Sequence, residues 1–371
     1  KILARFFSTP AKSSVTDPSR IYQGWPLTEI PDAVLQEFGV TTITSAERFG
    51  TGLINDTFLV ATADGERYVL QALNPVFDPQ INVDIDTLTR HLEKKGLATQ
   101  RIRPTQDDKL WIELDERSWR MTSFVPGVCH DMLTSGRQAY EAGALLAKFH
   151  LAVDDLEIEL HTTRLGVHDT ERHLAALREA LEVHRDHEAF AAIETLAEAV
   201  LEAAEELPAL PELPDRLVHG DPKISNLVFD ADTGNAICMI DLDTLAHMPL
   251  PLELGDAFRS WCNPCGEDTE GTMFRLDLFT AAIEGYASQA RDFLTTQEST
   301  SLIPATRTIM VELAARLTTD ALNESYFGWN PDMFANRSTH NQVRAAGQLE
   351  LHRSLCEQLS EVEAAVERAF N

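Results

Sequence analysis

The chain lacks the features that would point to a membrane or a nucleic acid as partner. No stretch of its 371 residues approaches the roughly 18 consecutive apolar residues of a membrane-spanning helix, and glutamates interrupt the most apolar segment, residues 189–207. Basic residues are scarce: 31 Lys and Arg face 59 Asp and Glu, a net charge of −28. Such a chain repels phosphate backbones and anionic lipids. The charge would suit a cationic substrate, although the solubility of charged helices explains it equally well.

Cysteines are also few, and their spacing does not define a framework. Of the five, Cys262 and Cys265 form a lone C-x-x-C pair, without the second pair that would complete a zinc site. We therefore expect reduced thiols in a cytoplasmic protein. Residues 1–30 contain prolines and basic residues but no apolar core of a secretory signal. We expect this segment to be a flexible leader.

Length and hydrophobic patterning predict two lobes. The chain is long for one domain, and its 44% hydrophobic and 24% charged residues are typical of a globular protein. Residues 31–126 combine strand-like runs, a hairpin signal at Asp64 and Gly65, and an amphipathic helix over residues 78–95. Residues 127–371 are mostly helical in pattern. These features predict an α+β protein with a small antiparallel β-rich N-lobe and a larger helical C-lobe.

Residues 217–226 carry the clearest chemical signal. An apolar run leads into His219 and Asp221, Asn226 follows five residues later, and a second apolar run ends in Asp241. This is the spacing of a kinase catalytic loop followed by a metal-binding aspartate, so we predict a bilobal protein-kinase-like fold that uses ATP and Mg²⁺. Asp221 can accept the proton of an attacking hydroxyl, and Asn226 and Asp241 offer oxygen ligands for the metal. Turn capping could explain each residue singly, but the joint spacing favours the kinase interpretation.

The N-lobe should hold the nucleotide. Gly50 and Gly52 lie at a turn between strands, where glycine lets backbone N–H groups approach phosphate oxygens. Asn55 and Thr57 add side-chain donors, although a tight hairpin turn alone would explain the two glycines. Kinases normally carry a lysine on the next strand, but this chain has Gln71 there. This departure implies another cation, a metal-dominated site, or lost activity.

Lys223 is a candidate for that other cation, because it follows the predicted catalytic aspartate by two residues. We therefore place it with Asp221 among the candidate catalytic residues. An exposed loop lysine is the alternative interpretation of the same position.

The catalytic loop resembles that of the aminoglycoside phosphotransferase and choline kinase superfamily, in which His-Gly-Asp-x-x-x-x-Asn is usual. Outer motifs resemble the N-acetylhexosamine 1-kinase branch, which also has glutamine at the lysine position. This resemblance covers roughly residues 40–352 and rests on residues 68–74, residues 119–124, residues 240–244 and a tail around residues 316–348. It implies that Thr122 and Phe124 lie at a hinge that meets adenine.

The same resemblance implies a sugar-like acceptor, phosphorylated at the anomeric hydroxyl of a hexose or N-acetylhexosamine. Arg316, Asp320 and Tyr326 would line its pocket, although Arg316 and Asp320 could equally form a surface ion pair at i,i+4 spacing. Asp243 is a further metal ligand, a sugar hydroxyl acceptor or a structural acid. Arg259 either binds substrate or pairs internally with a neighbouring acid.

Two other activities stay open. A kinase for an amino-alcohol or aminoglycoside would suit the acidic surface and predicts an acidic pocket. A nucleotide-binding pseudokinase would explain the missing lysine, but it has no need of the base Asp221. The oligomeric state is open at this point.

Overall fold

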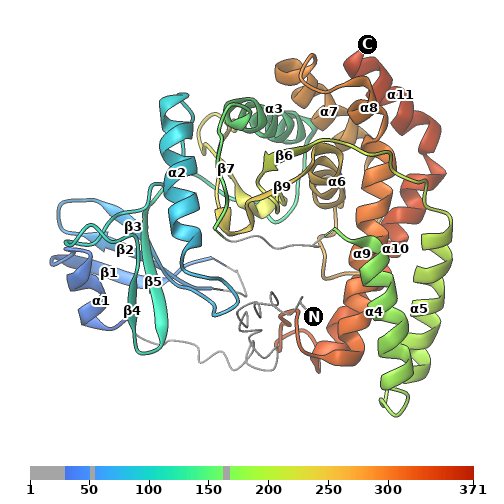
Figure 1. Ribbon diagram of the computed structural model, residues 1–371, viewed down its shortest axis with the longest axis horizontal. Coiled ribbons are helices and arrows are strands. Elements are labelled where there is room, and N and C mark those ends of the chain that lie inside the picture. Colours follow the sequence, from blue (N-terminus) through green and yellow to red (C-terminus); the bar gives the residue numbers. More distant parts are fainter. Residues whose placement is uncertain (1–29, 51–54, 162–167) are drawn as a thin grey trace, which may run out of the picture.

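The computed structural model describes residues 30–50, 55–161 and 168–371. A β-rich N-lobe lies on one side of the molecule, and a larger group of helices, the C-lobe, forms the other side (Figure 1). The predicted α+β, bilobal protein-kinase-like fold is confirmed. The predicted leader falls almost wholly on residues 1–29, outside the described residues, and no helix that the structure describes is long and apolar enough to cross a membrane.

The N-lobe is built on a five-stranded antiparallel sheet with the order β1-β2-β3-β5-β4. Its strands are β1 (Ile43–Arg48), β2 (Asp56–Thr62), β3 (Arg67–Ala72), β4 (Ile112–Leu114) and β5 (Arg117–Ser123). The predicted hairpin turn between β2 and β3 includes Gly65, whose φ of 89° is readily accessible only to glycine. Helix α1 (Asp32–Glu37) buries Val34 and Leu35 in a small core with Phe58, Leu70 and Trp119 from one face of the sheet.

Helix α2 (Ile81–Lys94) lies in the N-lobe by sequence but packs into the C-lobe core. Its buried apolar residues share one hydrophobic cluster with helix α3 (Gly136–Val153): they are Ile81, Ile85, Leu88 and Leu92. At the end of α2, Lys95 Nζ pairs with Asp155 Oδ2 at 2.5 Å. The predicted division at residues 126–127 lies in the connection between β5 and α3, but α2 ties the lobes together across that boundary.

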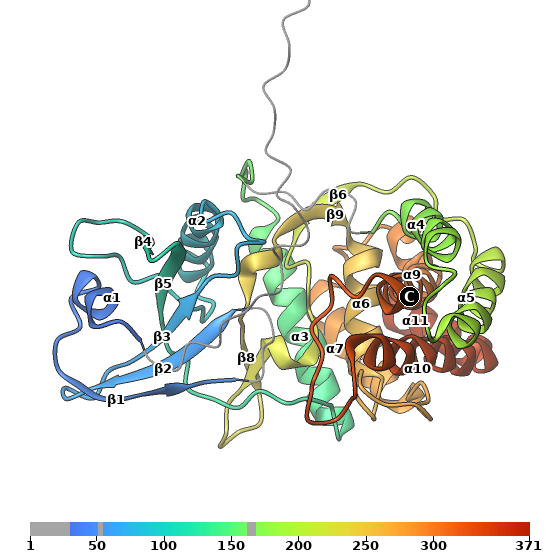
Figure 2. The same cartoon turned by 90° about the horizontal axis from the view of Figure 1, so that it is seen from below.

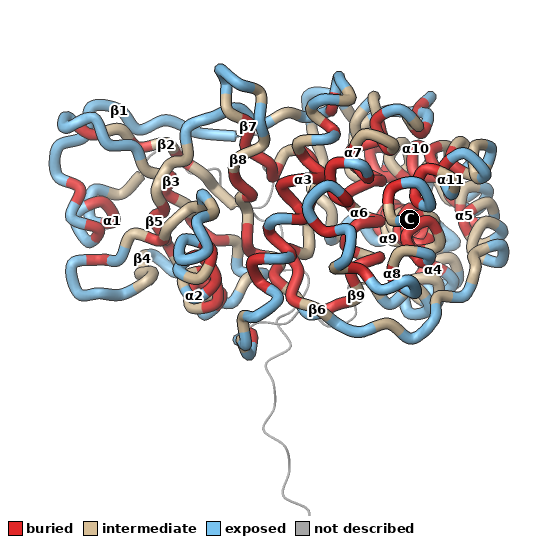
Figure 3. Tube along the Cα trace, turned by 90° about the horizontal axis from the view of Figure 1, so that it is seen from above, coloured by how far each residue is buried: buried red, intermediate tan, exposed pale blue. Residues whose placement is uncertain are grey.

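The C-lobe core is helical, and its buried residues concentrate in the central helices α3, α6 (Leu250–Trp261), α7 (Leu276–Ala290) and α9 (Leu302–Asn323) (Figure 3). The other described helices of this lobe are α4 (Thr170–Val183), α5 (Phe190–Glu205), α8 (Thr296–Thr300), α10 (Arg337–Glu357) and α11 (Leu359–Phe370). Helices α4 and α5 both pack on α9.

Two short antiparallel pairs carry the predicted catalytic loop. Strand β6 (Asp215–Val218) pairs with β9 (Ala246–Pro249), and β7 (Leu227–Phe229) pairs with β8 (Ala236–Met239). Figure 2 shows these strands at the junction between the five-stranded sheet and the helices. They therefore place the loops after β6 and β8 where the two lobes meet.

Helices α3 and α7 cross closely because each contributes a glycine at the crossing. A Cβ added at Gly143 would overlap the carbonyl oxygen of Ala282, and one added at Gly285 would overlap the carbonyl oxygen of Tyr140. Glycine inside a helix costs about 1 kcal/mol relative to alanine. The close backbone approach is therefore a packing reason for glycine at these two positions.

We predict that Gly143→Ala lowers the free energy of unfolding by about 1–3 kcal/mol, because the added methyl group forces the two helices apart. Chemical denaturation of the purified variant measures this change. Gly136→Ala is the matched control, since a Cβ at Gly136 would lie 3.5 Å from the Ala281 Cβ, which is ordinary contact. Equal stability of the Gly143 variant and the native chain would contradict the packing argument.

Candidate active site

The catalytic loop begins where β6 ends, and side chains of helix α6 bond to its backbone. Glu253 of α6 is fully buried, and its two carboxylate oxygens each accept a hydrogen bond of 3.0 Å, from the backbone N–H groups of His219 and Gly220. Further along the loop, Trp261 Nε1 donates to the carbonyl oxygen of Pro222 at 2.8 Å. Buried carboxylates require such donors. Side chains of helix α6 therefore fix the loop backbone at two points.

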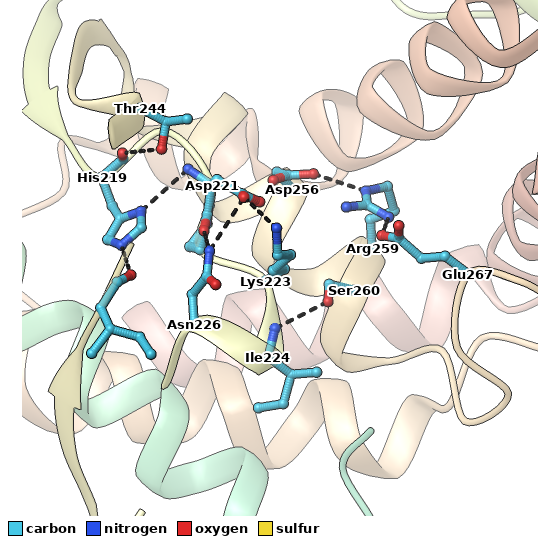
Figure 4. A network of polar contacts seen from close by, with 12 residues as sticks. His219, Asp221, Lys223, Ile224, Asn226, Thr244, Asp256, Arg259, Ser260 and Glu267 are labelled. Carbon is cyan, nitrogen blue, oxygen red and sulfur yellow. Dashed lines mark hydrogen bonds and ion pairs between the residues drawn. The ribbon is translucent and has the colours of Figure 1, made fainter. Parts of the chain in front are cut away.

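His219 braces the loop and is buried. Its Nε2 donates to the carbonyl oxygen of Ile240 at 2.9 Å, and its Nδ1 accepts from the backbone N–H of Asp221 at 3.3 Å. Thr244 Oγ1 donates to the His219 carbonyl oxygen at 3.0 Å. These contacts join the loop after β6 to the turn after β8 (Figure 4).

The antiparallel β7–β8 pairing brings Asn226 and Asp241 to the same end of this strand pair. Leu227 lies opposite Met239, and the Ile240 N–H donates to the Asn226 carbonyl oxygen at 2.9 Å, so the residues flanking the two strands face each other. Asn226 Nδ2 donates to the Asp221 carbonyl oxygen at 2.9 Å and lies 3.2 Å from Asp221 Oδ2. The structure thus brings together all three residues of the predicted catalytic motif.

The environment of Asp241 fits a cation. Its backbone has a φ of 65°, a left-handed conformation that is uncommon for a non-glycine residue and is often found at functional sites. Burial raises the pKa of Asp241, the charge of Asp243 raises it further, and the ammonium of Lys223 opposes the rise. A divalent cation would offset this concentration of negative charge.

Asn226 and Asp241 would hold such a cation through oxygen atoms. Because Asn226 Nδ2 is bound to Asp221, the Asn226 Oδ1 is left for another partner. No group of three or more His, Cys, Asp or Glu side chains in the described ranges could bind a metal by itself. The Asn226 and Asp241 oxygens fit Mg²⁺, which usually takes one or two protein ligands together with water and substrate phosphates.

Lys223 lies against the predicted base. Its Nζ donates to Asp221 Oδ2 at 2.6 Å. Burial alone would lower the pKa of Lys223, but the charges of Asp221 and Asp241 raise it above its ordinary value, so the ammonium stays charged. The position agrees with a charge beside the reacting groups and not with a freely exposed loop lysine.

The structure describes all of the predicted nucleotide-binding residues except Gly52, and their contacts differ. Gly50 has a φ of 80° with open space where a Cβ would lie, whereas Gly52 falls outside the described residues. Thr57 Oγ1 accepts from Gln71 Nε2 at 3.2 Å. Asn55 Nδ2 donates to Asp243 Oδ2 at 3.1 Å, so this side chain contacts the C-lobe.

The two predicted hinge residues lie at the end of β5. Thr122 is inside the strand, and its buried Oγ1 has no hydrogen-bond partner among the described residues. Phe124 follows the strand, and its ring packs between the guanidinium of Arg67 at 4.2 Å and the ring of Phe49 at 5.9 Å. Phe49 precedes Gly50, so the residue before this glycine contacts the predicted hinge.

Asp243 is occupied by N-lobe donors. Arg120 donates from Nη2 to Asp243 Oδ2 at 2.7 Å and from Nη1 to Oδ1, and the carboxylate is 1% exposed. Of the three roles that the sequence left open for Asp243, this geometry favours the structural one. Its contact with substrate or metal stays a prediction.

Arg259 belongs to a charged network beside the catalytic loop. Its Nε donates to Asp256 Oδ1 at 2.8 Å, and its Nη1 donates to Glu267 Oε1 at 2.5 Å. Figure 4 shows this group on the Lys223 side of Asp221. Burial raises the pKa of Asp256, Arg259 opposes the rise and the charge of Asp221 adds to it, while Arg259 holds the pKa of Glu267 down to about 2. The internal Arg–Asp pair considered from sequence is therefore present.

Asp320 shapes the loop that carries Tyr326. Its carboxylate accepts hydrogen bonds of 2.8–2.9 Å from the backbone N–H groups of Ser325, Tyr326 and Phe327 and from the side chain of Asn341. Arg316 does not pair with it in the described contacts; its guanidinium lies over the Phe327 ring at 5.7 Å. Tyr326 is 38% exposed. Pocket-lining roles for these three residues stay predictions.

Sequence reasoning missed two buried residues, Arg120 and Glu253. Arg120 stands between the buried residues Trp119 and Met121 of β5, and a charge in such a strand requires a buried partner. That signal was present in the sequence, but the partner lies 123 positions away. Glu253 gave no comparable signal, since a lone glutamate near a helix start is usually solvent-exposed.

Comparison with known proteins agrees with this geometry. The model of the phosphotransferase enzyme family (APH) matches residues 45–290. A homoserine kinase of Neisseria meningitidis serogroup B is 26% identical over 137 residues, which make up 37% of this chain and 44% of that protein. The chain thus spans less than half the length of this curated relative.

Solved kinases share the fold at low identity. A microcompartment-associated aminopropanol kinase is 15% identical with a TM-score of 0.59, over 88% of this chain and 96% of that one. An amicoumacin kinase solved with AMP-PNP and Ca²⁺ is 12% identical with a TM-score of 0.57, over 84% and 93% of the two chains. The chain belongs to the phosphotransferase enzyme family. The predicted superfamily is confirmed, whereas the N-acetylhexosamine 1-kinase branch is not.

We predict that Glu253→Gln lowers kcat by at least about tenfold, because an amide can accept from only one of the two loop N–H groups and leaves the other unpaired. Steady-state kinetics and thermal unfolding of the purified variant measure the effect on rate and stability. Glu284→Gln on the exposed face of α7 is the control for the same chemical change. An unchanged kcat in the Glu253 variant would remove its role in holding the loop.

Proposed function

We propose that the protein is an ATP- and Mg²⁺-dependent small-molecule kinase that phosphorylates a sugar hydroxyl. The anomeric position of a hexose or N-acetylhexosamine is the proposed target, and the cytoplasm is the proposed location. The observation that supports phosphoryl transfer is the convergence of Asp221, Asn226 and Asp241 beside the charged Lys223. The sugar assignment rests on the ion pairs beside Asp221 that are described below.

The proposed reaction is a single displacement at the γ-phosphorus of ATP. The Asp221 carboxylate accepts the proton of the acceptor hydroxyl while its oxygen bonds to phosphorus and the bond to the β-phosphate oxygen breaks, which releases ADP. Lys223 orients Asp221 and places a positive charge near the transferred group. Asn226 and Asp241 would hold Mg²⁺, which would neutralise charge on the phosphates.

Mixed charge beside Asp221 supports a neutral acceptor rich in hydroxyl groups. Asp256 and Glu267 are paired with Arg259, and Arg344 Nε pairs with Asp268 Oδ1 at 2.6 Å. Arg344 Nη1 also donates to the Gly328 carbonyl oxygen at 2.9 Å, which connects this network to the loop with Tyr326. Carboxylates already paired with guanidinium groups suit a neutral acceptor better than a cation, for which unpaired carboxylates would be expected.

Two alternatives follow from specific observations. The homoserine kinase and aminopropanol kinase among the similar proteins, together with the net charge of −28, favour an amino-alcohol acceptor. The absence of lysine at Gln71 favours a nucleotide-binding pseudokinase. The retained position of Asp221 against Asn226 and Lys223 speaks against the second alternative, since nucleotide binding alone does not need a base.

An acceptor screen tests the proposal directly. We expect ADP release with free hexoses or N-acetylhexosamines to exceed that with homoserine, aminopropanol, choline and aminoglycosides by at least about tenfold, the discrimination that a few unpaired polar groups provide. ³¹P NMR of the product would identify an anomeric phosphate. Preferential turnover of an amino-alcohol would reverse the order of the two proposals, and no turnover with any acceptor would favour the pseudokinase.

We further predict that Asp221→Asn lowers kcat by about 10²–10⁴-fold, the usual contribution of a general base. The affinity for MgATP, measured by titration calorimetry, should change by less than about threefold, because Asp221 is not a predicted metal ligand. Asp230→Asn, on the exposed β7–β8 turn, is the control for the same change. Full activity in the Asp221 variant would refute its role as the base.

A further inference from the structure

In the N-lobe sheet, a guanidinium from the neighbouring strand lies beside Gln71, the residue at the predicted lysine position. The β3–β5 register sets Gln71 opposite Arg120, and Arg120 Nε donates to Gln71 Oε1 at 2.9 Å. Gln71 is oriented for this contact because its Nε2 donates to Thr57 Oγ1. The Arg120 guanidinium therefore lies at the end of the side chain that would be the lysine in other kinases.

From this place Arg120 reaches across to the C-lobe. It forms a two-pronged pair with the Asp243 carboxylate, and the two side chains are only 4% and 1% exposed. Its Nη1 also lies 3.4 Å from Asn82 Oδ1 on α2. Such bidentate geometry fixes orientation as well as distance. One side chain thus connects β3, α2 and the turn after β8.

That turn carries Asp241, the predicted metal ligand, two residues before Asp243. Asp241 has a strained left-handed backbone, so its carboxylate keeps its direction only while the neighbouring residues are held. Asp243 is held by Arg120 and also by Asn55 Nδ2, and Asn55 Oδ1 in turn accepts from the Asn74 N–H at 2.8 Å. All of these donors come from the N-lobe.

We propose that Arg120 is a positioning residue that takes the place of the absent β3 lysine. By holding Asp243, it fixes the turn that bears Asp241 against the N-lobe and aligns MgATP with Asp221. The inference rests on the proposed ATP-dependent activity. Arg120 acts through Asp243 and not as a phosphate ligand, because its guanidinium is engaged by Asp243, Gln71 and Asn82.

A purely structural pair would behave differently. Desolvation offsets much of the attraction in a buried ion pair, and removing both charges together is often tolerated by the fold. A structural role therefore predicts that the double variant Arg120→Gln/Asp243→Asn folds and keeps its kinetics. A positioning role predicts that this folded double variant still binds MgATP more weakly and turns over more slowly.

The decisive experiment returns the cation to β3. We expect Arg120→Gln to weaken the affinity for MgATP, measured by titration calorimetry, by at least about tenfold and to lower kcat as well. Adding Gln71→Lys to that variant places an ammonium on the strand opposite position 120. Because it can pair with the same Asp243, the exchange should recover about tenfold or more of the lost kcat/KM. Gln71→Lys alone should not improve the native chain.

Arg117→Gln is the matched control, since it makes the same change on the same strand and Arg117 pairs with Asp56 of β2 at 2.9 Å. Native MgATP affinity and kcat in the folded Arg120→Gln/Asp243→Asn variant would overturn the proposal, as would failure of Gln71→Lys to recover activity in Arg120→Gln. Absence of MgATP binding and ADP release in the native chain would overturn the proposed function itself. If the native chain binds MgATP and releases ADP, and the Arg120 variants match it in affinity and kcat, only this inference is overturned.

Discussion

The antiparallel pairing of four short strands is the constraint on which the site depends. Asp221, Asn226 and Asp241 each lie next to an end of β6, β7 or β8, so the strand register decides whether they meet. A slip of one residue would turn the strand side chains to the opposite face and shift the attached loops. His219, which bonds to Ile240, and Glu253, which bonds to the loop backbone, resist such a slip from two directions. The chemistry is therefore fixed by backbone geometry first and by side-chain contacts second.

Charge balance couples the two lobes at this site. Asp221 and Asp241 share the charge of Lys223 from the same loop, whereas Asp243 takes its cation from β5 in the N-lobe. An uncompensated buried carboxylate is costly, so the C-lobe turn is fully stabilised only when the N-lobe is in place. Helix α2 strengthens the same coupling, because its apolar face packs into the C-lobe core. Large independent motion of the lobes would break both contacts.

Local signals in the sequence were sufficient for the fold and for the central motif. The hairpin at Gly65, the helices and the spacing from Asp221 to Asn226 depend on neighbours within a few residues, which the sequence presents directly. The pair of Arg120 with Asp243 spans 123 positions, and that of Glu253 with His219 spans 34. Such partners are chosen by the packing of whole elements, and no periodicity in a single chain encodes them. The three roles left open for Asp243 could not be separated from the sequence for the same reason.

The residues predicted to bind the acceptor are positioned by contacts between helices that are far apart in the sequence. Asp320 organises residues 325–327 through their backbone N–H groups, with Asn341 of α10 as a further donor. The loop conformation, and with it the position of Tyr326, is thus set by a contact between α9 and α10. An aminopropanol kinase and an amicoumacin kinase share this fold at 15% and 12% identity, although their names indicate very different acceptors. The acceptor must therefore be inferred from the residues that hold this loop and the charged network around Arg259, and not from the fold.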